Sequence, residues 1–148
     1  MVRMVSAIFV LLTIAGPAFA QGLIVKQAQG SVDETVEKFK AAVEGAGATV
    51  FAVVDHAKGA TSVGSQIPPA TVVIFGNPKL GTPLIAANPQ IGLDLPLKVL
   101  VWDEGGKTMI GYTDPVALKD RYGVTGADKT FDTISGALGK LTDKAAAE

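Results

Sequence analysis

The 148-residue sequence contains no cysteine and only one histidine, His56. The absence of cysteine excludes disulfides, thiolate nucleophiles, iron–sulfur clusters and the common cysteine zinc sites. A single histidine also excludes multi-histidine metal sites, so a metal carrier is the weakest function that we consider. The sequence therefore predicts no metal site and no resident cofactor.

An excess of charge of one sign is also absent. The chain has 13 Lys+Arg and 14 Asp+Glu, a formal charge of −1. This balance gives no reason to expect nucleic acid or an acidic membrane surface as a partner.

Long hydrophobic runs are absent apart from one short run near the start. Arg3 precedes an apolar run over 4–14, which is too short for a membrane span. Gly16-Pro17 ends any helix, and Ala18-Phe19-Ala20 has the form of a cleavage site. Residues 1–20 are therefore predicted to be a signal peptide, rather than an N-terminal anchor helix.

The predicted mature chain is a single domain of residues 21–148, which begins at Gln21 and is periplasmic or secreted. Loss of Arg3 leaves 12 Lys+Arg against 14 Asp+Glu, a formal charge of −2. No other run approaches membrane length, so we expect no membrane partner after leader removal.

Hydrophobic periodicity predicts an α+β domain. Ser31 and Glu34 have the spacing of a capping box at the start of a helix, and the patterns over 97–102 and 108–112 indicate an antiparallel hairpin. The expected element order is β-α-β-β-α-β-β-α-α. We predict a two-layer sandwich, with a mostly antiparallel five-stranded sheet and helices packed on it.

Two apolar runs predict buried strands. Residues 49–54 are nearly all apolar, which is typical of an interior strand covered on both faces, and 71–75 follow as a second buried strand. The Gly/Ser/Pro-containing stretch between them, 57–69, is expected to be a loop or a weak helix. Asp128 is expected to cap the last helix, which carries apolar residues at helical spacing.

The segment from Phe75 to Pro89 is the most distinctive of the chain. Asn77-Pro78 and Thr82-Pro83 each place an N-cap residue before proline, which predicts one helical turn, a break at Gly81 and a second short helix. The glycines at 76 and 81 have the Walker A separation, but Thr82 replaces the lysine of that motif. Helix starts also bind anions, so a small anionic ligand is a candidate partner, although capping alone explains the pattern.

Five residues are candidates for ligand binding, and none is predicted to be catalytic: Asp55, His56, Asn77, Thr82 and Asp94. Asp55 and His56 are neighbours at a strand end, where successive side chains point to opposite faces, so they do not readily form an acid–base pair. A lone histidine is more often structural, and we expect His56 to be buried. The sequence contains no GxSxG motif, so it gives no support for nucleophilic hydrolysis.

Three segments give the mature chain a resemblance to a known family: DHA at 55–57, FGNPKLGTPL at 75–84 and LDLPLKVLVW at 93–102. Over 23–141 the chain resembles the domain of unknown function 302 family of small bacterial and archaeal domains. The resemblance implies an α/β sandwich, a homodimer and no established activity. Matching motif positions are His56, Asn77, Pro78, Gly81, Thr82, Pro83, Asp94 and Pro96.

The sequence thus favours an exported, non-catalytic module that binds a small ligand or a partner. The alternative is a small enzyme with His56 as general base. The two differ in whether Asp55 and His56 converge with Asn77 and Thr82 on one pocket.

Overall fold

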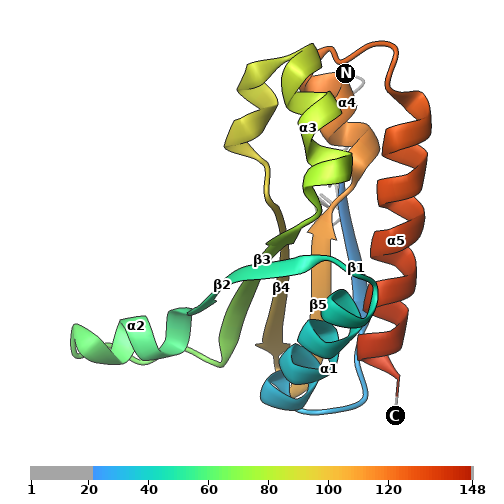
Figure 1. Ribbon diagram of the computed structural model, residues 1–148. Helices are drawn as coiled ribbons and strands as arrows, with labels where there is room; N and C mark the ends of the chain where they lie inside the picture. Colours follow the sequence, from blue (N-terminus) through green and yellow to red (C-terminus); the bar gives the residue numbers. More distant parts are fainter. Residues whose placement is uncertain (1–21, 148) are drawn as a thin grey trace, which may run out of the picture.

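The computed structural model describes residues 22–147 (Figure 1). The predicted signal peptide and its cleavage site lie outside the described residues. No helix among residues 22–147 is long and apolar enough to cross a membrane.

Five strands form one antiparallel sheet with the order β1-β5-β4-β3-β2. The strands are β1 (Leu23–Gln27), β2 (Thr49–Asp55), β3 (Ala70–Gly76), β4 (Leu97–Glu104) and β5 (Lys107–Thr113). The β4–β5 hairpin is confirmed, and Gly105 and Gly106 form its turn with φ of 62° and 85°. Glycine suits this turn because both positions need positive φ.

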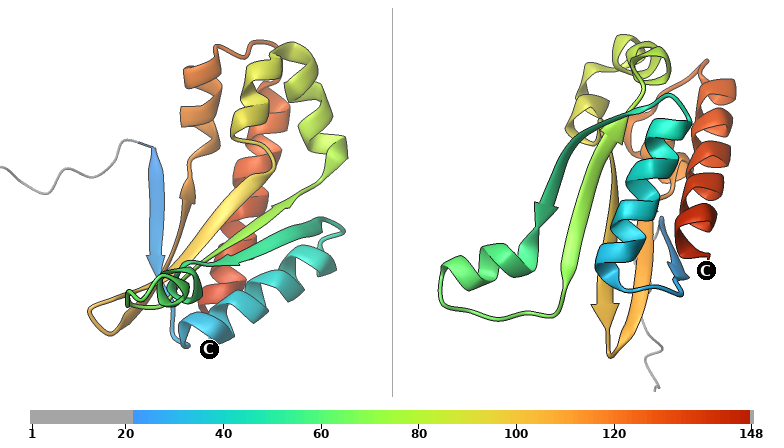
Figure 2. Two further views of the ribbon diagram at one scale, coloured as in Figure 1. Left: turned by 90° about the vertical axis from the view of Figure 1, so that its left-hand side faces the viewer. Right: turned by 60° about the horizontal axis from the view of Figure 1, so that its bottom comes forward.

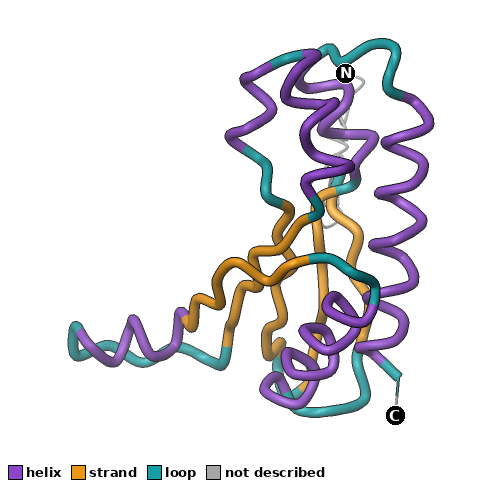
Figure 3. The backbone as a smooth tube through the Cα atoms, in the orientation of Figure 1, coloured by secondary structure: helices purple, strands orange, loops and turns teal. Residues whose placement is uncertain are grey.

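The helices are distributed unequally around the sheet (Figures 1 and 2). Helices α1 (Val32–Gly45) and α5 (Asp128–Ala146) pack on one face, and α3 (Pro78–Ala87), the 3₁₀ helix η1 (Pro89–Leu93) and α4 (Pro115–Tyr122) lie at one end. Helix α2 (His56–Ser62) projects from the other end, as the tube in Figure 3 shows. This architecture confirms the predicted α+β class, with α2 as an additional helix.

The core lies between the sheet and the α1–α5 layer. Alternate residues of the central strands are buried on this side, including Val73, Phe75, Val99, Val101 and Ile110. The rings of Phe39 on α1 and Phe75 meet edge to face, with centroids 5.1 Å apart. The capping box of Ser31 and Glu34 is confirmed and fixes where α1 begins.

The opposite face of the sheet is apolar apart from polar residues such as the exposed Lys98, and it has no helical layer among the described residues. The intervening residues of β3 and β4 point there, among them Ile74, Leu100 and Trp102, and all three are half-buried. The Trp102 ring lies over Gly111 of β5, where an added Cβ would come within 3.1 Å of the ring. We call this surface, with Val25, Val54, Val72 and Met109, the open face.

The prediction that residues 49–54 form an interior strand is wrong. Strand β2 is at the sheet edge, and each of its residues is exposed or half-buried. Its register shifts at a bulge between Val50 and Ala52, which leaves Phe51 54% exposed. Apolar composition alone does not distinguish a strand covered by its own chain from an edge strand that remains uncovered.

The predicted break inside 78–87 is also wrong. Helix α3 is continuous: the Gly81 N–H donates to the Asn77 carbonyl at 3.0 Å, and Pro83 lies inside the helix. Asn77 is confirmed as the N-cap, whereas Thr82 is an interior residue of the helix. Without an N–H, Pro83 removes the helical bond to the Lys79 carbonyl, but one missing bond does not end the helix.

Asp128 does not cap the last helix. Ala127 occupies the N-cap position of α5 and makes no side-chain cap hydrogen bond. The Asp128 carboxylate instead pairs with the Lys119 ammonium of α4. An aspartate at the first helical position still interacts favourably with the positive end of the helix dipole.

Candidate binding pocket

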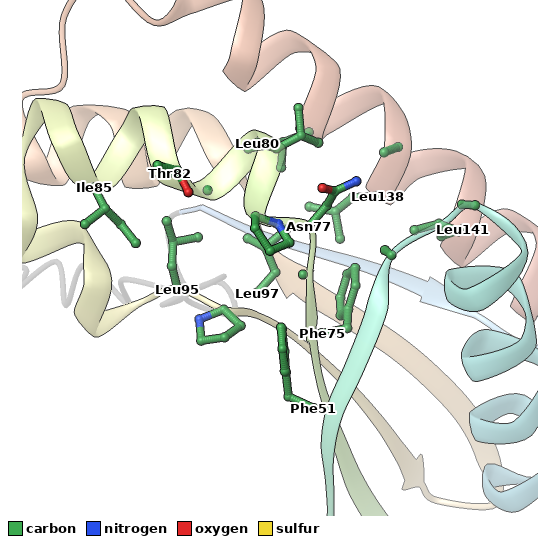
Figure 4. Close-up of a pocket in the computed structure, with 18 residues that line it drawn as sticks. Phe51, Phe75, Asn77, Leu80, Thr82, Ile85, Leu95, Leu97, Leu138 and Leu141 are labelled. Atoms are coloured by element: carbon green, nitrogen blue, oxygen red, sulfur yellow. The ribbon is translucent and has the colours of Figure 1, made fainter.

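A cavity of about 310 Å³ opens at the end of the sheet where α3 begins (Figure 4). Its walls come from the bulged edge of β2, the β3–α3 junction, the segment before β4 and the inner side of α5. The cavity exists because α1 ends at Gly45, so that neither α1 nor α3 fills this corner between sheet and α5.

The lining is almost entirely hydrocarbon. Of the described residues that line the cavity, none is ionisable, and the two polar side chains are Asn77 and Thr82. Figure 4 labels the principal apolar residues around them: Phe51, Phe75, Leu80, Ile85, Leu95, Leu97, Leu138 and Leu141. Such a surface favours apolar ligands and disfavours a charge, which would lose its hydration without gaining a partner.

Asn77 joins the pocket to the start of α3. Its Oδ1 accepts from the Lys79 N–H at 3.0 Å, and its backbone carbonyl accepts from Leu80 and Gly81 at 2.9 and 3.0 Å. Pro78 has no N–H. Every backbone donor at positions 78–81 is therefore absent or already used within the helix.

Asp94 lies behind the pocket wall. Its Oδ2 accepts from the Tyr122 hydroxyl at 2.7 Å and from the Arg121 guanidinium at 2.9 Å, and Oδ1 is 3.9 Å from the Lys98 ammonium. These contacts tie the end of η1 to α4, and the next two residues, Leu95 and Pro96, line the cavity. Asp94 thus positions the pocket wall without lining it.

The Tyr122 hydroxyl is the main cause of a lowered pKa at the Asp94 carboxyl, with further contributions from Arg121 and Lys98. The same hydrogen bond raises the pKa of Tyr122. Both pKa shifts have the same cause, because the hydrogen bond favours an ionised Asp94 carboxylate that accepts from a protonated Tyr122 hydroxyl.

The structure does not bring Asp55 and His56 to the same pocket as Asn77 and Thr82. Thr49 of β2 pairs with Gly76 beside the cavity, whereas Asp55 ends the strand six residues further on, about 20 Å away at 3.3 Å per residue. The Asp55 carboxylate caps α2 by accepting from the Lys58 N–H at 2.8 Å. His56 is exposed at the first turn of α2, so the expectation that it is buried is wrong.

Sequence reasoning missed the apolar residues of the pocket. Leu80, Leu97 and Leu138 have the spacing of ordinary core residues, and nothing in a single sequence separates a core contact from a cavity wall. The one available signal is the family motif around Asn77, which marks the cavity's rim.

The Asp94 contacts predict a pH dependence of stability. A lowered pKa in the folded state adds stability above the unfolded pKa of about 3.9, and this stability is lost as pH falls through the folded value. We expect Asp94→Asn to lower the free energy of unfolding at pH 7 by about 1–2 kcal/mol. Urea denaturation between pH 3 and 7 measures it.

The difference between Asp94→Asn and the parent should shrink towards pH 3. Asp120→Asn is the matched control, since Asp120 is an exposed aspartate of α4, the helix whose Arg121 and Tyr122 contact Asp94. An equal stability loss in both variants, or a difference independent of pH, would contradict the assigned role of Asp94.

A comparison with solved structures supports the architecture. The chain resembles a crystal structure described as an uncharacterized conserved protein DUF302 from Bacillus stearothermophilus, with a TM-score of 0.78 and 20% sequence identity. The match covers 85% of this chain and 99% of that one. At this identity the likeness establishes the shared fold.

Some sequence relatives are proteins that are longer than this chain. The chain is 36% identical over 129 residues to proteins named Fluoride-specific ion channel FluC 1, from Brucella suis biovar 1 (strain 1330) and Brucella abortus biovar 1 (strain 9-941). The aligned region covers 86% of this chain and 51% and 48% of those proteins. The chain therefore spans about half the length of these relatives.

A family model assigns the domain itself. The model described as Domain of unknown function DUF302 matches residues 24–141. This range includes most of α5 and all five strands, except for the first residue of β1. The chain belongs to the DUF302 family.

Proposed function

We propose that this protein is a non-catalytic binding module whose cavity beside Asn77 holds a small apolar ligand. The observation that carries the proposal is the cavity of about 310 Å³, lined by hydrocarbon and by two neutral polar side chains. Its volume is at the lower end of the range of small-molecule sites. Burial of ligand and wall from water supplies the affinity, at about 25 cal/mol per Å² of apolar surface.

The alternative, an enzyme with His56 as general base, finds less support. A general base needs a partner or substrate site within hydrogen-bond reach. Among the described residues, the His56 side chain has no hydrogen-bond partner, and its neighbour Asp55 caps α2. Neither residue lines the apolar cavity.

Binding can be tested with N-phenyl-1-naphthylamine, a neutral probe that fluoresces in apolar surroundings. We expect the protein to bind it and Ala137→Phe to weaken binding at least tenfold, because the ring enters the cavity from α5. Fluorescence titration gives the dissociation constants, and the melting temperature shows that the variant folds.

Lys140→Phe is the matched control, because it adds the same ring at an exposed position of α5 outside the cavity. Ala48→Phe fills the cavity from the opposite wall and serves as a second variant. Absence of probe binding, or equal binding by the parent and both cavity variants, would overturn the proposed function.

We also propose that the protein forms a homodimer through the open face. Five strands spaced about 4.8 Å apart, with about 20 Å of length, give a face of about 500 Å². Lys98 of the central strand shares this face with Leu100 and Ile74, so its apolar area is smaller than the whole face. Exposed apolar patches mark interaction sites. A stable dimer buries about 800 Å² per partner, so the sheet alone is too small.

Helix α2 and the segment that follows it supply the remaining surface. The α2 arm, residues 56–69, has no buried residue in its helix and leaves the sheet on the side away from α1 and α5, as the right view of Figure 2 shows. Val63 and Ile67 of this arm are 77% and 46% exposed. In a twofold dimer each arm reaches the open face of the other copy, and both apolar surfaces become covered.

A charge at the centre of the open face should separate the copies. We expect the parent to have the mass of a dimer by light scattering, and Leu100→Glu to shift it to a monomer, since Leu100 lies on the central strand of this face. Lys140→Glu on the helical layer is the control. A monomeric parent, or a folded Leu100→Glu variant that remains dimeric, would refute this interface.

The location that we propose is the periplasm or the exterior of the cell. The support is the leader pattern of Arg3, the short apolar run and Ala18-Phe19-Ala20. An intact mass that starts at Gln21 would match the proposal, and an intact N-terminus on recovered protein would contradict it.

A further inference from the structure

We propose that the ligand of the cavity is a neutral, hydrocarbon-rich molecule with one hydrogen-bond acceptor, which the side-chain amide of Asn77 binds. This inference rests on the proposed binding function and specifies the chemistry of the same site. A medium-chain alcohol represents the class, and a carboxylate or an amine of equal length represents the charged alternatives.

The lining excludes a charged headgroup by its chemistry. No ionisable side chain is among the residues that line the cavity, so neither a carboxylate nor an ammonium would meet an opposite charge. Asp94 is near the wall, but it is already paired with Tyr122 and Arg121. A charge that enters an apolar site without a partner loses hydration that nothing replaces.

The start of α3 does not supply an anion site either. Helix starts bind anions through free backbone N–H groups. Here the Lys79 N–H is bound by the Asn77 side chain, those of Leu80 and Gly81 are bound by the Asn77 carbonyl, and Pro78 has none. The feature that suggested an anionic ligand is therefore occupied within the chain.

The Asn77 amide offers a specific polar contact. Its Oδ1 must accept from the Lys79 N–H, so that Nδ2 is the atom left for other contacts. Within the described residues Nδ2 has no hydrogen-bond partner, and Asn77 is half-buried on the cavity wall (Figure 4). A ligand oxygen that accepts from Nδ2 would satisfy this donor while the hydrocarbon contacts Phe75, Leu80 and Leu97.

The volume sets the length of the hydrocarbon part. An enclosed apolar cavity of about 150 Å³ holds one benzene ring, so about 310 Å³ takes roughly two ring-sized groups, and the open mouth lets a larger probe extend over the rim. A chain of eight carbons with a terminal oxygen is of this size. Octan-1-ol, octanoate and octylammonium therefore form a series in which only the headgroup differs.

The first measurement is displacement of N-phenyl-1-naphthylamine from the full-length protein at pH 7.5 by these three compounds. We expect octan-1-ol to bind at least tenfold more tightly than octanoate and octylammonium. Octanoate or octylammonium binding as tightly as octan-1-ol would overturn the neutral-ligand inference, while probe binding itself would still support the proposed function. Failure of the probe to bind would overturn both.

The second measurement isolates the Asn77 amide. Asn77→Ser keeps an N-cap oxygen but removes Nδ2, so we expect octan-1-ol to bind about fivefold more weakly and the naphthylamine, which has no strong acceptor, to bind within twofold of the parent. Asp114→Ser is the control, since Asp114 also caps a helix through Oδ1, which accepts from the Val116 N–H at 2.9 Å, but lies outside the cavity.

Melting temperatures of both variants distinguish loss of the amide from loss of the fold. If Asn77→Ser folds and binds octan-1-ol as the parent does, Asn77 is only a helix cap and the assigned contact is wrong. If Asp114→Ser weakens octan-1-ol binding to the same extent, the effect comes from helix capping, and the inference also fails.

Discussion

Within residues 22–147, helices cover the sheet on one face only, and the remaining features depend on this constraint. Helices α1 and α5 pack against the central strands through contacts such as Phe39 with Phe75, and they bury alternate residues of β3, β4 and β5. These two helices do not cover the whole of this face, because α1 ends at Gly45. The corner beyond the end of α1 remains a cavity, and the other side of the sheet remains an apolar surface.

The family motif residues lie in two separate places, at the cavity and at the start of the α2 arm. Asn77, Gly81, Thr82 and Pro96 line the cavity, and Asp94 holds the adjacent wall against α4. Asp55 and His56 lie at the opposite end of β2, where Asp55 caps the projecting α2. The motif residues thus lie at a pocket at one end of the molecule and at an arm at the other.

The parts of the fold that the sequence predicts correctly are set by local chemistry. The capping box at Ser31, the cap at Asn77 and the glycine turn of the β4–β5 hairpin each depend on residues within a few positions. The predictions for strand β2 and helix α3 are wrong because residues distant in the sequence determine the position of β2 and the continuity of α3. Whether β2 lies at an edge depends on strand order, and the continuity of α3 through Pro83 depends on packing that outweighs one lost hydrogen bond.

The candidate site was predictable only at its polar rim. Asn77 and Thr82 stand out as capping residues, whereas the leucines and phenylalanines that make the cavity are indistinguishable from core residues until the elements are assembled. An unfilled corner results from helix lengths and packing angles, which no local pattern encodes. The prediction of an anionic ligand rests on the helix starts, where the sequence shows the backbone donors but not the partners that occupy them at Asn77.

Native mass spectrometry of the protein purified from its own cells tests the central claim most directly, because it weighs protein and retained ligand together. The account predicts that the protein carries an added mass, which organic solvent extracts as a neutral, hydrocarbon-rich molecule. The Ala137→Phe variant should lack this added mass. Protein that carries no added mass from any preparation, or an added mass that proves to be a charged hydrophilic compound and survives Ala137→Phe, would contradict it.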